Sequence, residues 1–420
     1  MKGEFLKRLQ NVFLRGLSMG SRFLLIFTLA KLLEPVDLGL FGLMLATVSF
    51  SALAIGADYY TYSHRELLSR PSNQWGDVIQ HQIWAQLLIY SVLLPAQFLV
   101  FALGLIDWSY VGWFFALLII EHLGQEINRI LIVLNKQLVA SWVMFLRLGS
   151  WVIIILPVMY FFDEARNLTV LYTAWFIGGG IGVIVGALMV TRTVPSWNDI
   201  EIDYKWMLRG LKVGGIFFVA TLCHKGLVTF DRYVIEGISS TELLGVYVFY
   251  VGLVFGLFAL LEPAVFSFLY PKILQHYQKG NKSEFLKSYK ELTLSTVFLG
   301  LVFSLFLWFF VPYIIDWIDK PIYEAYLESF YILIAVGFVY GLCHIPHYAL
   351  YAMKGDKWII GAHISSLLVF FITVWYVQLE NAMQRVGLAL LIAFIWMFCT
   401  KLIGYNSARK TSKLLSVHLA

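Results

Sequence analysis

Long apolar runs follow one another along the whole chain, separated by short polar segments. Each run holds about 20 residues, which is the length that a helix needs to cross the hydrocarbon core of a bilayer. The pattern predicts about twelve membrane-spanning helices and leaves no polar segment long enough for a separate domain. The predicted spans are 12–32, 38–59, 79–102, 111–133, 140–162, 170–191, 208–230, 243–268, 291–315, 325–351, 358–378 and 384–405.

The composition agrees with this pattern. Of the 420 residues, 60% are hydrophobic and 14% are charged, a balance that excludes a water-soluble globular protein of this size. The first run lacks a small-residue cleavage site, so we expect it to remain as the first helix and not to act as a cleaved signal peptide. The three cysteines all lie inside apolar runs, and their spacing predicts neither disulfides nor a metal site. The predicted fold is an all-α polytopic membrane protein.

The basic residues predict the orientation of the chain. With the N-terminus in the cytoplasm, 22 of the 31 Lys and Arg residues fall in cytoplasmic tails, loops and helix ends, five fall on the outer side, and Arg22, Arg129, Arg147 and Lys225 remain within helices. An excess of this size is typical of cytoplasmic loops. Both termini are therefore expected in the cytoplasm. The five outer residues are Lys31, Arg166, Arg232, Lys320 and Arg385.

A repeated pattern predicts two halves. Residues 15–20 (RGLSMG) open the first span, and residues 209–214 (RGLKVG) open the seventh. Because six spans separate the copies, the repeat is parallel and the halves are related by an axis along the membrane normal. We expect a six-helix lobe over 1–191, a cytoplasmic linker over 192–207 and a second six-helix lobe over 208–420, with a central cleft between the lobes.

Two cations stand inside apolar runs. Arg22 lies about halfway along the first span, and Lys225 follows Thr221 by one helical turn in the seventh. A charged side chain at the bilayer centre costs roughly 2.5–3.5 kcal/mol on insertion scales, so it usually faces a wet cavity or a partner. Both are predicted to bind an anion in a cavity. The alternatives are a structural ion pair for Arg22, and for Lys225 a contact with headgroups or with Asp231.

The fourth span carries a stripe of polar side chains on one side of the helix, which cannot face lipid. Arg147 in the next span is a plausible partner for one of its carboxylates and a third candidate for the cationic cavity. The stripe is either an internal salt-bridge network or a site where a carboxylate takes up a proton or Na⁺. Its candidate residues are Glu121, Gln125, Glu126 and Arg129.

Four further polar residues are candidates for lining a cavity or coupling an ion. Asp58 closes the second span, where we expect hydration at the membrane surface. Glu262 precedes Pro263, and the proline predicts a local break in the helix. His344 and His347 share a face of the tenth span, but an i, i+3 histidine pair without acidic or Cys ligands in register predicts a polar wall and not a metal site.

Motifs for ATP hydrolysis and for zinc-dependent hydrolysis are absent. The sequence has no Walker A or HExxH motif, so we expect neither ATP hydrolysis nor another enzymatic activity. No cofactor and no nucleic-acid partner is expected. A polytopic glycan polymerase or ligase would need a catalytic outer loop, and the outer loops are short. A non-transporting scaffold for a glycan-assembly complex is a further alternative.

The segments after the first and seventh spans resemble a known family. Leu33-x-Pro35-x-Asp37-Leu38-Gly39-Leu40-Phe41, with Leu244-Gly245-Val246-Tyr247 in the second half, resembles the Wzx-type polysaccharide flippases of the multidrug/oligosaccharidyl-lipid/polysaccharide exporter superfamily. The resemblance implies two six-helix lobes that open alternately to each side of a bacterial cytoplasmic membrane. It also implies a cationic cleft, which fits Arg22 and Lys225.

The resemblance implies a flippase for undecaprenyl-diphosphate-linked oligosaccharides. The expected partners are that anionic lipid-linked substrate, membrane lipids, H⁺ or Na⁺ as a coupling ion, and glycan polymerase or glycosyltransferases in a complex. The alternative is an exporter of soluble drugs or metabolites with the same architecture.

Overall fold

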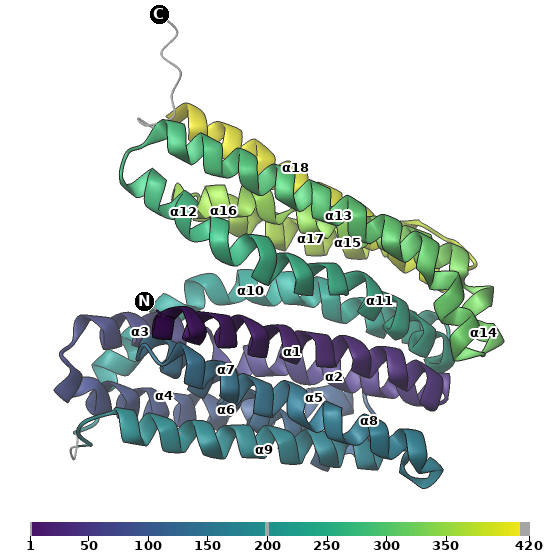
Figure 1. The fold of residues 1–420 in the computed structure, drawn as a ribbon, viewed down its shortest axis with the longest axis horizontal. Coiled ribbons are helices and arrows are strands. Elements are labelled where there is room, and N and C mark those ends of the chain that lie inside the picture. The colour runs from purple at the N-terminus through teal and green to yellow at the C-terminus, as the bar shows by residue number, and fades with distance from the viewer. Residues whose placement is uncertain (1, 198–200, 412–420) are drawn as a thin grey trace, which may run out of the picture. The chain divides into compact units, whose positions relative to one another are not determined.

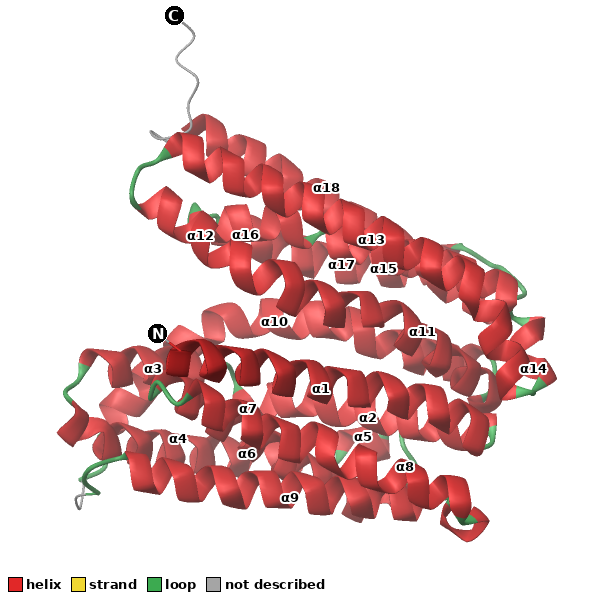
Figure 2. Ribbon diagram, viewed as in Figure 1, coloured by secondary structure: helices red, strands yellow, loops and turns green. Residues whose placement is uncertain are grey.

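A computed structural model describes residues 2–197 and 201–411 of the chain. Within these residues the chain is built from helices joined by short loops, with no strand (Figure 2). Figure 1 labels most of them. The helices are α1 (Lys2–Leu32), α2 (Pro35–Gly56), α3 (Tyr60–Ser69), η1 (Ser72–Gln74), α4 (Trp75–Ala96), α5 (Leu99–Ala102), η2 (Trp108–Tyr110), α6 (Val111–Val133), α7 (Gln137–Phe145), η3 (Leu146–Ser150), α8 (Trp151–Phe161), η4 (Asp163–Ala165), α9 (Leu168–Thr193), α10 (Tyr204–Ile238), α11 (Thr241–Leu261), η5 (Glu262–Phe266), α12 (Ser267–Gln278), α13 (Lys282–Ile318), α14 (Pro321–Ala325), α15 (Leu327–Leu342), α16 (His344–Ala352), α17 (Asp356–Tyr376) and α18 (Ala382–Thr411).

The predicted all-α membrane fold is confirmed. In the described residues, 10 helical segments are long and apolar enough to span a membrane, and α10 brings the number to 11 if its two parts, bent by 47°, form one span. The remaining predicted span is α6, which has the required length but carries Glu121, Glu126 and Arg129. The charges that make α6 chemically interesting also lower its hydropathy.

The structure extends several predicted spans. α13 has 37 residues and begins at Lys282, nine positions before the predicted start. Its first turns are polar, so hydropathy does not reveal them, but the Asn281 side chain accepts a hydrogen bond from the backbone N–H of Glu284 and caps the helix. A short helix, α3, lies within the segment 60–78 that was predicted to be a loop.

Two helices are widened by a π-helical turn. Between α7 and α8 the turn η3 contains Arg147, and between α11 and α12 the turn η5 contains Glu262 and Pro263. The break predicted at Pro263 is therefore confirmed, since proline has no N–H to donate and its ring displaces the carbonyl one turn earlier. π-Helical turns often coincide with functional sites.

The chain divides into two compact units. Unit 1 contains residues 1–28 and 41–222, and unit 2 contains residues 29–40 and 223–420. The predicted lobes over 1–191 and 208–420 stay a prediction, and residues 198–200 of the proposed linker lie outside the described residues.

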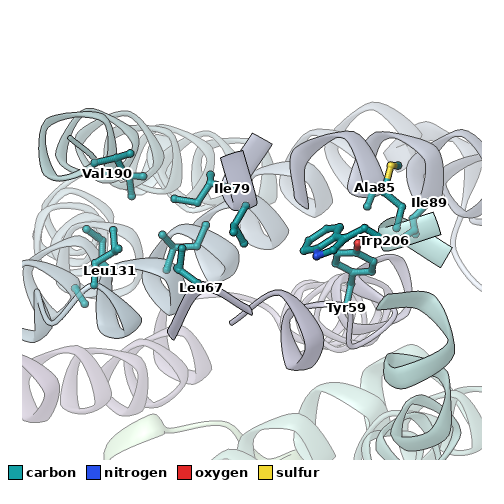
Figure 3. Close-up of a cluster of buried hydrophobic side chains, with 14 of the residues drawn as sticks. Tyr59, Leu67, Ile79, Ala85, Ile89, Leu131, Val190 and Trp206 are labelled. Carbon is teal, nitrogen blue, oxygen red and sulfur yellow. The ribbon is translucent and has the colours of Figure 1, made fainter. Parts of the chain in front are cut away.

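Each unit has its own apolar core. In unit 1, Tyr59, Leu67, Leu131, Val190 and Trp206 belong to one buried cluster (Figure 3). In unit 2 a second cluster includes residues from α11, α12, α13, α16 and α18. Tight helix contacts support both units. Gly245, for example, lies so close to the backbone of Pro35 that a methyl group would overlap it.

Candidate functional site

Arg22 lies on α1 in unit 1 with its side chain exposed. It makes no hydrogen bond or ion pair with any residue that the structure describes. Glu121 and Arg147 are within electrostatic range, so the local charge is mixed. The guanidinium is therefore a cation on a membrane span whose donors are available to a ligand or to water.

Arg147 occupies a different environment, because it is buried and paired. Its Nη1 atom lies 2.8 Å from Glu121 Oε2 and also donates to the Glu121 carbonyl at 3.1 Å. The indole of Trp175 donates to the other carboxylate oxygen of Glu121 at 2.8 Å. The structure thus pairs Arg147 with Glu121, one of its two expected partners. The Nε atom of Arg147 is buried and has no partner in the described residues.

Small residues make room for this ion pair. A methyl group on Gly124 would overlap Cδ of Arg147, and one on Gly182 would lie 2.9 Å from Arg147 Cβ. Close packing from both α6 and α9 fixes the guanidinium, and the π-helical turn η3 re-aims the chain where Arg147 is anchored. This arrangement is that of a structural ion pair, and the predicted role of Arg147 in binding a substrate remains untested.

The other end of the polar stripe on α6 is also internally paired. Glu126 accepts hydrogen bonds from Arg129 at 2.5 Å and from Gln82 on α4 at 2.8 Å. The guanidinium of Arg129 also lies over the ring of Tyr60, 3.9 Å from its centroid. Gln125 is half-buried, and no hydrogen bond of its side chain joins this network. Most of the stripe forms the salt-bridge network that was one of its two expected roles.

An apolar pocket of about 320 Å³ lies beside Glu126, between α4, α6 and α9. This volume is at the small end of the range for ligand pockets, about 300–1,000 Å³. Its polar wall includes Tyr90 and His122, which are hydrogen-bonded to one another, and Nε2 of His122 is buried without a hydrogen-bond partner in the described residues. A mainly apolar pocket with a few polar groups suits an amphipathic organic molecule.

Asp58 is buried, with 4% of its surface exposed, which corrects the expected hydration at the membrane surface. It stands in a tight turn with positive φ at Ala57 and Asp58, and the backbone of this turn packs against Gly214 of α10. Burial raises the pKa of Asp58, while a hydrogen bond with Thr221 and the charge of Arg129 oppose the rise. Asp58 is buried because this turn packs against α10, which the hydropathy of the sequence does not indicate.

In unit 2, Lys225 is half-buried on α10. Asp231, a partner considered for it, has no exposed surface and accepts hydrogen bonds from Arg232 at 3.0 Å and Tyr247 at 2.7 Å. Glu262 is half-buried in the π-helical turn η5. The predicted roles of Lys225 and Glu262 in binding or coupling are untested.

His344 and His347 belong to a larger group that sequence reasoning missed. Their rings lie beside His224 of α10 and His363 of α17, and Lys401 of α18 is within electrostatic range of all four histidines. Lys401, a lysine inside the last apolar run, is a sequence signal that could have pointed to this group. Among the described residues, no group of three or more His, Cys, Asp or Glu is arranged to hold a metal ion.

The comparisons with known proteins give a fold. No family model matches the chain, and no curated protein matches it. Solved structures do match over nearly the whole length. An inward-facing multidrug resistance MATE family transporter of the MOP superfamily aligns with a TM-score of 0.73 and 13% identity, covering 93% of this chain and 96% of that one.

Two other solved structures give the same result. A MATE protein in complex with MaD3S aligns with a TM-score of 0.66 and 14% identity, covering 96% of this chain and 97% of that one. A mutant of the Vibrio cholerae MATE transporter VcmN aligns with a TM-score of 0.62 and 12% identity, covering 98% and 97%. The chain is therefore a multi-pass membrane protein with the fold of the MATE transporters of the MOP superfamily.

Proposed function

We propose that this chain is an exporter that works by alternating access and catalyses no covalent chemistry. The observation that carries the proposal is the similarity of fold over more than nine-tenths of the chain to transporters of one superfamily. Fold alone does not define a substrate. The substrate must therefore be argued from the side chains.

The first candidate substrate is a drug or metabolite that carries both apolar surface and a negative charge. Two observations in unit 1 support it. The pocket beside Glu126 suits apolar surface, and Arg22 offers guanidinium donors that no described residue occupies. A guanidinium binds carboxylates and phosphates through two parallel hydrogen bonds, so it favours substrates with these groups.

The second candidate is an undecaprenyl-diphosphate-linked oligosaccharide, which would make the chain a flippase of a bacterial cytoplasmic membrane with both termini inside. Arg22 favours this candidate too, because a diphosphate headgroup is strongly anionic. H⁺ or Na⁺ would reset the empty carrier, and glycosyltransferases or a glycan polymerase would be its partners. This is the substrate class of the family that the segments after the first and seventh spans resemble.

Purified protein in proteoliposomes tests both candidates. One set of vesicles measures efflux of a carboxylate-bearing fluorescent dye, and another measures the appearance of a polyprenyl-diphosphate oligosaccharide in the opposite leaflet. Arg22→Gln should lower transport of whichever of the two substrates the protein accepts at least tenfold. Arg192 is exposed at the end of α9, and Arg192→Gln should leave that transport unchanged. Transport of neither substrate, or of organic cations only, would contradict the proposal.

A further inference from the structure

Five aromatic side chains of unit 2 form a closed group, which we call the histidine ring: His224, Tyr340, His344, His347 and His363. Neighbouring ring centroids are separated by 5.9 Å (Tyr340 to His224), 4.5 Å (His224 to His363), 6.0 Å (His363 to His347), 6.2 Å (His347 to His344) and 5.0 Å (His344 to Tyr340). The members come from α10, α15, α16 and α17 (Figure 1).

The histidine ring contains buried ring nitrogens without hydrogen-bond partners in the described residues, on His224, His347 and His363. The Tyr340 hydroxyl lies 3.5 Å from Nε2 of His224, and with this hydroxyl donating, the proton of that imidazole is on Nδ1. Nδ1 of His224 is buried and has no partner in the described residues. His363 is 7% exposed, and neither of its nitrogens has a partner among these residues, so its N–H lacks an acceptor and its other nitrogen lacks a donor.

Lys401 adds a cation beside these unpartnered nitrogens. It is 2% exposed, and it forms no hydrogen bond or ion pair with the residues that the structure describes. An ammonium group carries three donors and no acceptor. A buried charge normally has a partner, because removing it from water is costly.

The charged neighbours of the histidine ring do not neutralise it. Lys401 and Lys225 act on His224, and Lys401 acts on the other three histidines. Glu262 is within electrostatic range of Tyr340 and of the neighbouring Tyr348. His363 and Lys401 thus combine one cation with buried imidazole nitrogens that lack partners in the described residues.

We propose that the histidine ring and Lys401 bind a small monovalent inorganic anion, with chloride as the natural ligand. A halide accepts hydrogen bonds from every direction and carries a negative charge, which suits the Lys401 ammonium and the imidazole N–H groups of His224 and His363, from three helices. Water would leave the charge of Lys401 without a counterion. The apolar surroundings, with Phe255, Phe258 and Phe394 against Tyr340, favour a weakly hydrated monovalent ion over sulfate or phosphate.

Thermal unfolding of the full-length protein in detergent tests this site without any transport assay. Sodium chloride and sodium bromide are compared with sodium gluconate and sodium sulfate at equal ionic strength. Binding to the folded state alone should raise the unfolding temperature saturably in the halides. Lys401→Met and His363→Gln should each weaken the apparent halide affinity at least tenfold, and Lys290→Met, an exposed lysine of α13, should preserve it.

Anomalous diffraction from bromide-soaked crystals of the unmodified protein gives a second readout, which does not depend on whether a variant folds. A bromide peak within hydrogen-bond distance of Lys401 Nζ and the His363 ring is expected. The proposal is overturned if no such peak is present, if halides stabilise no more than gluconate, or if both variants respond to chloride as the unmodified protein does. Because the site binds its anion at equilibrium, failure of the transport assays would leave these results unaffected.

Discussion

The polar groups of α6 and the histidine ring show two ways of placing charge inside a membrane protein. In unit 1, Glu121 pairs with Arg147 and Glu126 with Arg129, so each of these two α6 carboxylates has its cation. In unit 2, Lys401 and His363 have no such partner among the described residues. The comparison teaches that the role of a charged residue in a span can be inferred only when its partners are known. Paired charges hold helices together, whereas donors without a protein partner can bind a ligand.

The largest effect is expected from breaking the buried ion pair of unit 1. Glu121→Gln leaves Arg147 as an uncompensated buried cation, and we expect it to lower the free energy of unfolding by about 3–5 kcal/mol. The double variant Glu121→Leu/Arg147→Leu should recover most of this loss, because it removes both charges. Unfolding in mixed detergent micelles measures both. If Glu121→Gln is as stable as the unmodified protein, the Glu121–Arg147 pair does not stabilise unit 1.

A smaller effect is expected from crowding the same pair. Gly124→Ala would place a methyl group that overlaps Cδ of Arg147, whose Cβ packs against Gly182 of α9. We expect a loss of about 1–3 kcal/mol in the same unfolding assay. Gly112→Ala, with open space around its Cβ position on the same helix, is the matched control and should cost nothing. Equal stabilities for the two variants would mean that the guanidinium is loosely held.

Removing a charge from unit 2 should raise the free energy of unfolding, whereas removing Glu121 from unit 1 should lower it. In gluconate, Lys401→Met removes a buried ammonium without a protein partner, so we expect the free energy of unfolding to rise by roughly 1–2 kcal/mol. The unfolding temperatures of the two proteins in gluconate check this. A loss as large as that for Glu121→Gln would place Lys401 in a structural pair and remove the contrast between the units.

The smallest effect concerns acid stability at α3. Burial and the nearby charge of Arg129 lower the pKa of His64 to about 4, whereas the unfolded chain has a pKa of about 6.5. The unfolded state therefore binds the proton more readily, and stability present above pH 6.5 is lost as the pH falls toward 4. Between pH 7 and 5.5 this amounts to about 1 kcal/mol, and His64→Gln should abolish that part of the pH dependence. If the free energy of unfolding of His64→Gln depends on pH as that of the unmodified protein does, the prediction is wrong.

Much of the fold could be predicted from the sequence because hydropathy alone marks helices that must face lipid. The polar start of α13 and the short helix α3 were missed for the same reason, since neither needs an apolar surface facing lipid. The pairing of Arg147 was predicted as one of two choices. The choice of Glu121 depends on the π-helical turn η3 and on small residues of α6 and α9, which no local pattern encodes.

The histidine ring could not be predicted, because each of its helices contributes only one or two polar residues. His224, His363 and Lys401 are far apart in the chain, and each lies in an otherwise mainly apolar run. Only the packing of α10, α16, α17 and α18 brings them together. The predicted substrate contacts of Arg22 and Lys225 depend on a ligand and on the lobes' arrangement, so they remain predictions.

The transport rate of purified Arg22 variants tests most directly the claim that an unpaired cation in this fold contacts an anionic substrate. Efflux of the carboxylate-bearing dye and flipping of the diphosphate-linked oligosaccharide are measured at equal protein density for Arg22→Gln, Arg22→Lys and Arg192→Gln. The account predicts that Arg22→Gln loses at least nine-tenths of the transport of the accepted substrate, that Arg22→Lys recovers part of it, and that Arg192→Gln is unaffected. Full activity of Arg22→Gln for that substrate would contradict the account.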